Sequence, residues 1–349
     1  MTARPRRPRV AMYTTVGERC GIADYSAALL PTLREHADVD TVVLRSGRLA
    51  PWALAADAYR LSRADVAHVQ HTYSFFGVDQ LTYTLVWRFL ASAVRAPLVV
   101  TAHTVRPSGP ARYDGGLGSA LANAVGAPAW HDVETFRRAQ AVIVHASLHR
   151  DRLVSRGVAA DRCIVVPPGV PPRVDVDAAA VRAYRERHGL GTRLVVGVFG
   201  FVERAKRFRL VLDALAEVGH GDAPALLITG YVPPAEVAVA LEAMDVVVVP
   251  YATEDSVSYS LHVALAQGRP VVATALAPLR ELDERGHCVA LVEPDDARDL
   301  AKTLGWLLDD SAARRRLSEA ACAYAAAQSV DATARRTLEV YARARQVAR

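Results

Sequence analysis

The sequence predicts an α/β protein with two Rossmann-like lobes, each built on a doubly wound parallel sheet. Short β-branched runs alternate with stretches rich in Ala, Leu and Arg. The alternation stops at VPPGVPPR (166–173) and then restarts. With 349 residues, 51% of them apolar, the chain has material for two hydrophobic cores. Because the apolar runs are continuous, we expect strands covered on both faces, as in parallel sheets.

The first lobe begins with a strand at RVAMYTT (9–15) and a helix at YSAALLPTLREHA (25–37). Further strands are predicted at 40–46, 65–71, 97–104, 141–147 and 162–169. Helices 51–63 and 81–95 carry apolar residues together with arginines. We favour helices that cover the core, and a surface that rests on a membrane is the alternative.

The segment VPPGVPPR contains four prolines in eight residues. Proline fixes its own φ and restricts the residue before it, so this segment is expected to be a stiff hinge. The predicted domains are therefore residues 1–170 and 171–349.

The second lobe repeats the pattern. Strands are predicted at 193–200, 224–230, 245–251, 270–275 and 287–293, with helices at 208–218, 235–243 and 258–267. Three more helices, at 296–309, 311–327 and 331–347, close the chain.

Composition limits the class of protein. The formal charge is +5, and the arginines of RPRRPR (4–9) read as a solvated start, so nucleic-acid binding is not expected. The four cysteines show no CxxC spacing, which argues against zinc and disulfides and favours a reducing cytoplasm. No apolar run reaches about 18 residues, and the N-terminus lacks the apolar core of a signal peptide.

Unusual polar residues follow the strands of the first lobe. Gly17 and Gly21 precede the first helix, where backbone N–H groups can approach an anion. On the third strand His68 and Gln70 share a face, while His71 opposes them, so a metal pair of the two histidines is not expected. His103 ends the fourth strand.

The second lobe has its own polar strand ends. Gly200 closes a strand, and the loop after it holds Glu203, Arg204 and Lys206. Lys206 is one of only two lysines among 42 basic residues. Three serines, at 256, 258 and 260, lie where a helix is expected to start. Cations beside a helix N-terminus suit a diphosphate.

These residues resemble retaining glycosyltransferases of family 4, which have the two-lobed GT-B fold. The matching pieces, in the family's order, are CGIADYSAALLPTL (20–33), HVQHTYSFFG (68–77), VVTAHT (99–104), VIVHASLHRDRLVSRG with IVVPPGV (142–157, 164–170), VFGFVERAKRF (198–208) and VVVVPYATEDSVSYSLHVALAQGRPVVAT (246–274).

The resemblance implies roles for particular residues. Lys206, with Arg204, would contact the diphosphate of the donor, and His103 would lie near the reacting sugar. The implied donor site comprises Gly200, Glu254, Asp255, Ser256, Ser258, Tyr259 and Ser260. The implied acceptor or phosphate loop comprises Gly17, Gly21, Asp24 and His71.

The chain departs from the family's pattern in four places, one of which is Tyr259, where some members have the glycine of a Ser-Ser-Gly-Ser stretch. Arg204 is offset, since Phe201 or Glu203 takes the position of the family's arginine. Val263 stands where the second of two glutamates is usual, and Asp255 stands at the first. After Gly230 the usual extra helix and strand near the base pocket are missing, because GYVPPAEV leads directly to the next helix.

The implied activity is metal-independent hexosyl transfer, with retention, from a UDP- or GDP-linked sugar to a small-molecule or lipid-linked acceptor. No cofactor beyond this co-substrate is expected. The DVD triplets at 38–40 and 175–177 do not sit at carboxyl ends of strands, so we read them as coincidence rather than a metal motif. A degenerate protein that binds a sugar or partner without transfer is the main alternative. An oxidoreductase or epimerase with a Rossmann lobe is disfavoured because GxGxxG and a Tyr-x-x-x-Lys pair are missing.

Overall fold

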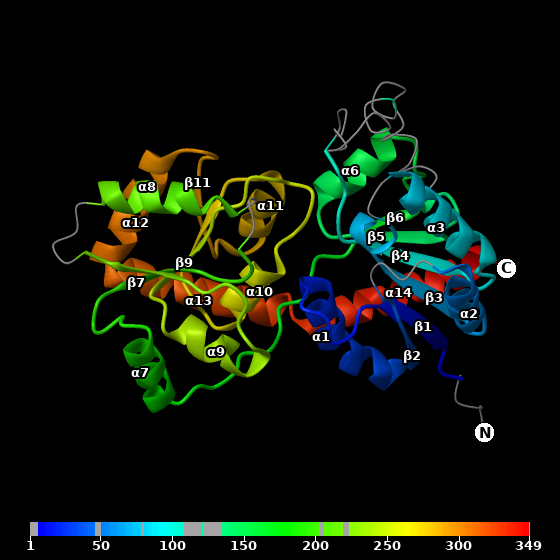
Figure 1. Cartoon of the computed structure of the whole chain (residues 1–349), viewed down its shortest axis with the longest axis horizontal. Coiled ribbons are helices and arrows are strands. Elements are labelled where there is room, and N and C mark those ends of the chain that lie inside the picture. The colour runs from blue at the N-terminus through cyan, green and yellow to red at the C-terminus, as the bar shows by residue number, and fades with distance from the viewer. Residues whose placement is uncertain are drawn as a thin grey trace. The chain divides into compact units, whose positions relative to one another are not determined.

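The computed structural model describes residues 6–45, 50–77, 80–107, 121, 135–202, 206–218 and 223–348. The chain divides into two compact units (Figure 1). The first comprises Met1–Pro168, Asp255–Val257 and Val330–Arg349, and the second comprises Gly169–Glu254 and Ser258–Ser329. Each unit has its own parallel sheet with helices packed on it, so the predicted pair of Rossmann-like lobes is confirmed.

The first sheet has the strand order β2-β1-β3-β4-β5-β6, and all its pairs are parallel. Its strands are β1 (Arg9–Thr14), β2 (Asp38–Val43), β3 (Val66–His71), β4 (Leu98–Ala102), β5 (Ala141–Val144) and β6 (Cys163–Val165). The inner strands β3, β4 and β5 are buried along their whole length. This burial on both faces explains why their sequences do not alternate between apolar and polar residues.

The main helices of the first unit form two layers. α1 (Gly21–His36) packs with α14 (Val330–Val347), and α2 (Pro51–Ser62) packs with α3 (Gln80–Ala93) (Figure 1). α1 leads outward to β2, whereas α2 and α3 lead the opposite way, from β2 to β3 and then to β4. Because parallel crossovers are right-handed, opposite directions place helices on opposite faces. α2 and α3 therefore share one face of the sheet.

Two short elements complete the described part of the first unit. η1 (Tyr73–Phe75) follows β3, and α6 (Ser147–Ser155) connects β5 to β6. An aromatic cluster that includes Phe76, Tyr83, Trp87 and Phe136 fills the space at the end of β3. The Trp87 indole N–H donates to the Thr135 carbonyl at 2.8 Å, so this large ring is buried without losing a hydrogen bond.

The second sheet is parallel, with the order β11-β10-β9-β7-β8. Its strands are β7 (Val195–Val198), β8 (Ala225–Ile228), β9 (Val246–Val249), β10 (Val271–Thr274) and β11 (Ala290–Val292). Its helices are α7 (Ala178–Arg187), α8 (Phe208–Glu217), α9 (Pro234–Glu242), α10 (Tyr259–Ala266), α11 (Ala277–Gly286), α12 (Ala297–Asp309) and α13 (Ser311–Ala327).

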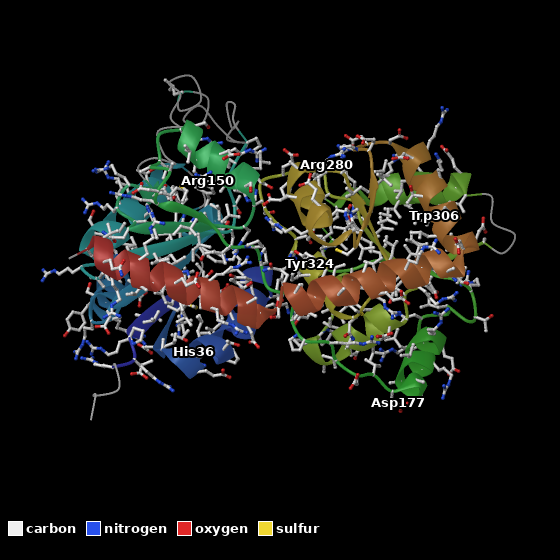
Figure 2. The ribbon with its side chains drawn as sticks, turned by 180° about the vertical axis from the view of Figure 1, so that it is seen from behind. His36, Arg150, Asp177, Arg280, Trp306 and Tyr324 are labelled. Atoms are coloured by element: carbon white, nitrogen blue, oxygen red, sulfur yellow. The ribbon has the colours of Figure 1, made fainter. Side chains whose placement is uncertain are left out.

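Central strand β9 shows how this sheet divides two cores. Val247 and Val249 enter one buried cluster, while Val246 and Val248 enter another on the opposite face. Tyr324 of α13, labelled in Figure 2, belongs to the first of these clusters and lies against α11.

All eleven predicted strands are present, within a few residues of their expected bounds. The helices that were not predicted are α6, α7 and α11. Each buries few side chains, for example Tyr184 alone in α7 and His149 with Leu153 in α6. Such short stretches give too weak an apolar periodicity to be recognised.

The last helix differs from the predicted domain division, which placed residues 171–349 in one domain. α14 packs on β3, β4 and β5 and on α1, so Val330–Arg349 belongs to the first unit. Thr32 of α1 donates to Asp331 at 2.5 Å, which ties the start of α14 to this unit. The reason is packing: buried Tyr341 and Ala344 fill the face of the first sheet that α1 leaves open.

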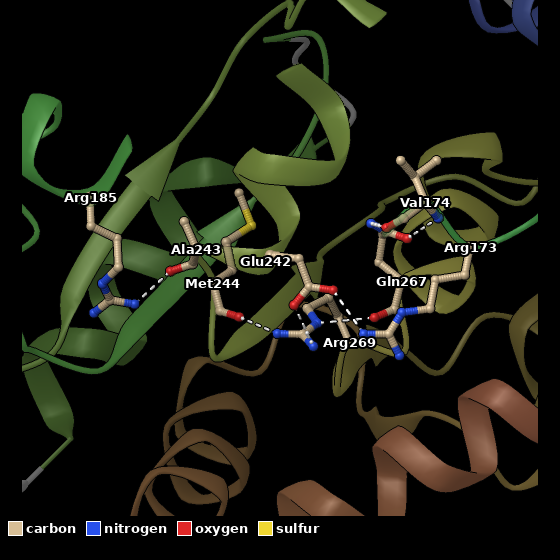
Figure 3. A network of polar contacts seen from close by, with 8 residues as sticks. All are labelled: Arg173, Val174, Arg185, Glu242, Ala243, Met244, Gln267 and Arg269. Atoms are coloured by element: carbon tan, nitrogen blue, oxygen red, sulfur yellow. Dashed lines mark hydrogen bonds and ion pairs between the residues drawn. The ribbon is translucent and has the colours of Figure 1, made fainter. Parts of the chain in front are cut away.

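Where the proline segment ends, the chain is held in the second unit by a group of polar contacts, called the clamp (Figure 3). The Gln267 amide accepts from Val174 N at 2.9 Å and donates to Val174 O at 3.0 Å. Beside it, Glu242 accepts from Arg173 at 3.2 Å and pairs with Arg269 at 2.9 Å. The buried Gln267 thus provides the pairing that a neighbouring strand would give.

We expect Gln267→Leu to destabilise the second unit by about 1–3 kcal/mol, because it removes both hydrogen bonds to the Val174 backbone. The measurement is urea unfolding of the full chain. Arg187→Ala is the control, since it removes an exposed ion pair with Glu236 and should cost at most about 1 kcal/mol. A wild-type midpoint for Gln267→Leu would show that the clamp contributes nothing.

Candidate functional site

The carboxyl end of β7 brings Gly200 and Lys206 together. Lys206 is 4% exposed, and its Nζ donates to the Phe199 carbonyl at 2.9 Å. Gly200 has a φ of +94°, and a Cβ added to it would lie 2.7 Å from Lys206 Nζ and 2.9 Å from Ser260 Oγ. The backbone conformation and the close ammonium therefore both require glycine here.

The start of α10 lies at the same place. Its N-cap, Ser258, accepts from Leu261 N at 3.2 Å and donates to Tyr251 OH at 3.1 Å. The ring centre of Tyr251 is 6.0 Å from Lys206 Nζ, within range of a cation–π contact. Tyr259 and Ser260 form the first turn, where backbone N–H groups carry partial positive charge. This corner thus combines a full charge with a helix dipole, which suits an anion.

Next to this corner, two aromatic rings stack. Phe201 and Tyr231 have ring centres 5.8 Å apart at an angle of 29°. Their positions follow from an antiparallel bridge between Gly200 and Gly230, supported by a hydrogen bond from Gly200 N to Thr229 Oγ1 at 3.1 Å. Tyr231 remains partly exposed. The pair offers a flat apolar surface beside the charged corner.

Sequence reasoning did not single out Tyr251, Thr229 or Tyr231. Each follows the end of a strand, Tyr251 after β9 and the other two after β8. Their position after strands could have identified them, since the carboxyl ends of parallel strands meet at one edge of a sheet, where ligands bind.

The other predicted donor residues lie elsewhere. Glu254 accepts from Ala277 N at 2.9 Å, so its carboxylate caps α11, a role that the sequence did not suggest. Asp255 and Ser256 group with the first unit, where the Asp255 carbonyl accepts from Val105 N at 2.7 Å. Arg204 and Glu203 lie outside the described residues. Val263 packs partly buried against the core of the second unit.

In the first unit, His103 belongs to a buried chain of polar side chains. Its Nε2 lies 2.7 Å from Gln70 Oε1, and its Nδ1 lies 3.3 Å from His145 Nε2. Gln70 Nε2 is 3.3 Å from His68 Nε2, and His68 Nδ1 is 2.7 Å from Tyr341 OH on α14. The chain thus connects α14 to the strand ends of β3, β4 and β5.

Donor–acceptor matching along this chain determines the tautomers. The Val166 carbonyl accepts from His145 Nδ1 at 2.9 Å, so in a neutral His145 the Nε2 atom is an acceptor. His103 then has an acceptor on each side, His145 Nε2 and Gln70 Oε1. A neutral imidazole carries a single N–H group, so it can donate to only one of these two acceptors. If the Gln70 amide turns its nitrogen toward His103 and its oxygen toward His68, every contact has a donor and an acceptor.

Burial and the neighbouring histidines lower the pKa of His103 well below its usual value, which favours this neutral arrangement. Burial also lowers the pKa of His68, to about 3. Both ring nitrogens of His103 are engaged with protein groups. His103 therefore helps to hold the end of β4 in place.

The predicted acceptor loop lies at the start of α1. Gly17 has a φ of +69°, in surroundings with space for a side chain, so its conformation rather than crowding requires glycine. Cys20 is the N-cap, and its sulfur accepts from Ala23 N at 3.3 Å. Gly21 and Asp24 are exposed in the first turn. The structure thus brings Gly17, Gly21 and Asp24 together at a helix N-terminus.

His71 does not join them. Its ring is buried among the aromatic side chains that follow β3, stacked 5.5 Å from Phe76 and bonded through Nε2 to Tyr83 OH at 3.0 Å. Burial, with a contribution from Arg106, lowers its pKa to about 3. The resemblance implied that His71 belongs to the acceptor or phosphate loop, but its side chain faces the core.

Among the described residues, no group of three or more His, Cys, Asp and Glu side chains is arranged to hold a metal ion. Within the same ranges, no helix has the length and apolar character needed to cross a membrane.

Two family models match consecutive parts of the chain. Residues 22–174 match the model described as Glycosyltransferase Family 4, and residues 174–310 match the one described as Glycosyl transferases group 1. Together they cover most of both units and meet just after the proline segment.

Curated relatives match over shorter stretches. A D-inositol 3-phosphate glycosyltransferase of Thermobispora bispora is 35% identical over 184 residues, which is 51% of this chain and 41% of the relative. A protein of the same name from Nocardioides sp. is 42% identical over 82 residues, or 24% of this chain and 18% of the relative. The matches therefore span less than half the length of these relatives.

Solved structures match over nearly the whole chain. HepE of Anabaena, in complex with UDP and glucose, has a TM-score of 0.73 at 16% identity, covering 95% of this chain and 99% of that one. WaaG, a glycosyltransferase involved in lipopolysaccharide biosynthesis, has a TM-score of 0.67 at 14% identity, covering 95% and 98%. At these identities the likeness concerns the fold, and it confirms the predicted two-lobed architecture.

The buried histidines predict that the protein loses stability in mild acid. Unfolded histidine titrates near pH 6.5, whereas His71 in the folded chain has a pKa of about 3. Between these values the unfolded state binds more protons, so stability falls as pH falls, by up to about 1.4 kcal/mol per pH unit for each such histidine. Above about pH 7 the effect vanishes.

His71→Phe should remove one of the protons that the chain takes up on unfolding in mild acid. The variant should fold, because phenylalanine fits an aromatic cluster and Tyr83 OH keeps Thr135 as a partner at 2.7 Å. The measurement is the free energy of unfolding between pH 5 and pH 7 for both proteins. The variant's dependence on pH should be shallower. An unchanged slope would mean that His71 is not held neutral by burial.

Proposed function

Because the chain belongs to the family 4 glycosyltransferases of GT-B fold, we propose that it transfers a hexosyl group from a UDP- or GDP-linked sugar to a hydroxyl-bearing acceptor in glycan or natural-product biosynthesis. We propose further that transfer retains the configuration at C1 and needs no metal. The observation that carries the proposal is the buried Lys206 ammonium beside Gly200, Ser260 and the start of α10.

This corner would hold the donor's diphosphate. As the bond from the sugar C1 to the phosphate oxygen breaks, negative charge grows on the leaving group. A fixed ammonium and oriented N–H groups stabilise that charge without reorganising at the moment of reaction. Ser260 Oγ and the N–H groups of Tyr259 and Ser260 would share the phosphate oxygens with Lys206. Because this help is electrostatic and built in, a divalent cation is not needed.

The nucleobase would rest on the stacked pair of Phe201 and Tyr231. Bases stack well on aromatic side chains, whichever base is present. This pair lies beside the bridge between Gly200 and Gly230, and Gly200 in turn adjoins the Lys206 ammonium. It also offers a base surface in a lobe that lacks the additional helix and strand seen elsewhere in the family. HepE binds UDP and glucose, which agrees with a UDP-type donor here.

The first unit would bind the acceptor. Gly17, Gly21 and Asp24 form an open helix start, where a hydroxyl-rich group can meet backbone N–H donors and one carboxylate. The relatives named above act on D-inositol 3-phosphate by name, so a phosphorylated polyol is one acceptor to include in a screen. A lipid-linked acceptor is another.

The proposed reaction uses no side-chain base. His103 is neutral and has both ring nitrogens engaged, so it would fix the shape of the site rather than move a proton. The acceptor hydroxyl would attack from the face that the phosphate leaves, and a leaving-phosphate oxygen would take its proton. That route retains configuration through an oxocarbenium-like transition state.

A binding protein without transfer activity is the second candidate. It is favoured by Val263 in place of an acidic residue and by the capping role of Glu254. Release of UDP or GDP from a panel of nucleotide sugars distinguishes the two candidates, since a binding protein would release neither.

We expect Lys206→Ala and Lys206→Met to lower transfer by a factor of about 100 or more, the typical effect of removing a group that stabilises developing charge. Released nucleotide is the measured product, with the unfolding midpoint checking that each variant folds. Lys302→Ala is the matched control, because Lys302 is the other lysine and is exposed on α12. Wild-type turnover in either Lys206 variant would remove Lys206 from the mechanism.

Transfer should continue at its full rate in EDTA, after dialysis against the chelator. If the ammonium and the helix start supply the positive charge, chelation removes nothing that the reaction uses. Loss of activity in EDTA that returns with Mg²⁺ or Mn²⁺ would contradict a metal-independent reaction.

A further inference from the structure

The outer side of α2 and α3 exposes large apolar side chains. Trp52 is 76% exposed and Tyr59 63% on α2, while Leu85 is 61% exposed and Phe89 42% on α3. These residues, with Arg63 and Arg88, are called the α2–α3 face. Single exposed apolar residues are common on soluble proteins, whereas a group of them on adjoining helices indicates an interaction surface.

The exposed apolar residues are distinct from those that α2 and α3 contribute to the core. On α2, Leu54 and Leu61 point into the first unit, and on α3 Val86, Trp87 and Leu90 do the same. Both helices lie on the same face of the sheet and pack against each other, so their outer sides form one surface (Figure 1). The core therefore does not explain the residues on the α2–α3 face.

The charges around the face are mostly of one sign. α3 contains no Asp or Glu, and the one acidic residue of α2, Asp57, accepts from Tyr13 OH at 3.0 Å. Arg63 lies 5.7 Å from the Tyr59 ring centre and donates to its hydroxyl, and Arg88 is exposed on α3. At one edge, Arg60 pairs with Asp40 of β2 at 3.2 Å. Aromatic rings among arginines are typical of helices that lie in a membrane interface.

We propose that the α2–α3 face binds the surface of a membrane that contains anionic lipids. Trp52, Tyr59, Leu85 and Phe89 would enter the boundary between headgroups and acyl chains, and Arg63 and Arg88 would meet lipid phosphates. The helices would lie along the surface without crossing it. A second copy of the chain fits less well, because pairing this face with itself would bring arginines against arginines.

Vesicle co-sedimentation of the full-length protein tests this proposal. Vesicles of equal parts phosphatidylglycerol and phosphatidylcholine should bind the protein, and binding should weaken as salt is raised, because screening reduces the attraction between arginines and phosphates. Vesicles of phosphatidylcholine alone should bind it at least about tenfold more weakly, since each of the two arginines near an anionic surface strengthens binding about fivefold.

Two double variants separate the apolar and the charged contributions. Trp52→Ser with Phe89→Ser should weaken binding to the anionic vesicles about tenfold or more, because two inserted rings are lost. Arg63→Gln with Arg88→Gln should weaken it and flatten its dependence on salt. The control is Trp306→Ser: Trp306 is 47% exposed on α12 of the second unit (Figure 2), and its loss should leave binding unchanged.

Because all these side chains are exposed, the variants should keep the wild-type unfolding midpoint, which is measured alongside. The proposal is overturned if wild type stays in solution with anionic vesicles, if the Trp52/Phe89 variant binds like wild type, or if Trp306→Ser weakens binding equally. Size-exclusion chromatography covers the remaining case: a wild-type dimer that the Trp52/Phe89 variant converts to monomer, without vesicle binding, would show a protein interface instead. None of these readouts depends on glycosyl transfer.

Discussion

A buried ammonium group is the constraint around which the candidate site is organised. Burying a cation is costly unless polar groups surround it, and Lys206 is held by the Phe199 carbonyl and faces the Tyr251 ring. The loop must bring these groups within reach, which requires the left-handed conformation of Gly200 and leaves no space for a Cβ there. The start of α10, with Ser258 as its cap, then adds its dipole to the same place. Charge, glycine and helix are three parts of one arrangement.

Much of the fold could be predicted because strands buried on both faces have a distinctive sequence. β9, with four valines, divides two cores and reads as a strand without any tertiary information. Short helices such as α7 bury too little to give a periodic signal. The unit to which α14 belongs could not be predicted either. A helix after α13 can return to either sheet, and the contact that decides it, from Tyr341 to His68, joins residues 273 positions apart.

The site was predictable to the extent that it depends on local position. Gly200, Lys206, Ser258 and Ser260 follow strands or begin a helix, and the structure brings them together. The errors arose where a long-range partner decides the role. The sequence does not show that the Glu254 carboxylate accepts from Ala277 N, 23 residues later. His71 lies at the end of β3, and its ring packs against Trp87 and Phe136, which are distant in the sequence.

The presence of a lysine at position 206, in a chain with few lysines, has a physical explanation. Nearly every basic residue is arginine, and of the two lysines Lys302 is exposed while Lys206 is buried. The ammonium of Lys206 occupies a space bounded by the Phe199 carbonyl, Ser260 Oγ and the bare Cα of Gly200. A guanidinium is wider and planar and needs partners for five N–H groups, which this corner does not have room to place. An arginine could take the place of an exposed lysine such as Lys302, whereas the space around Lys206 suits a compact point charge.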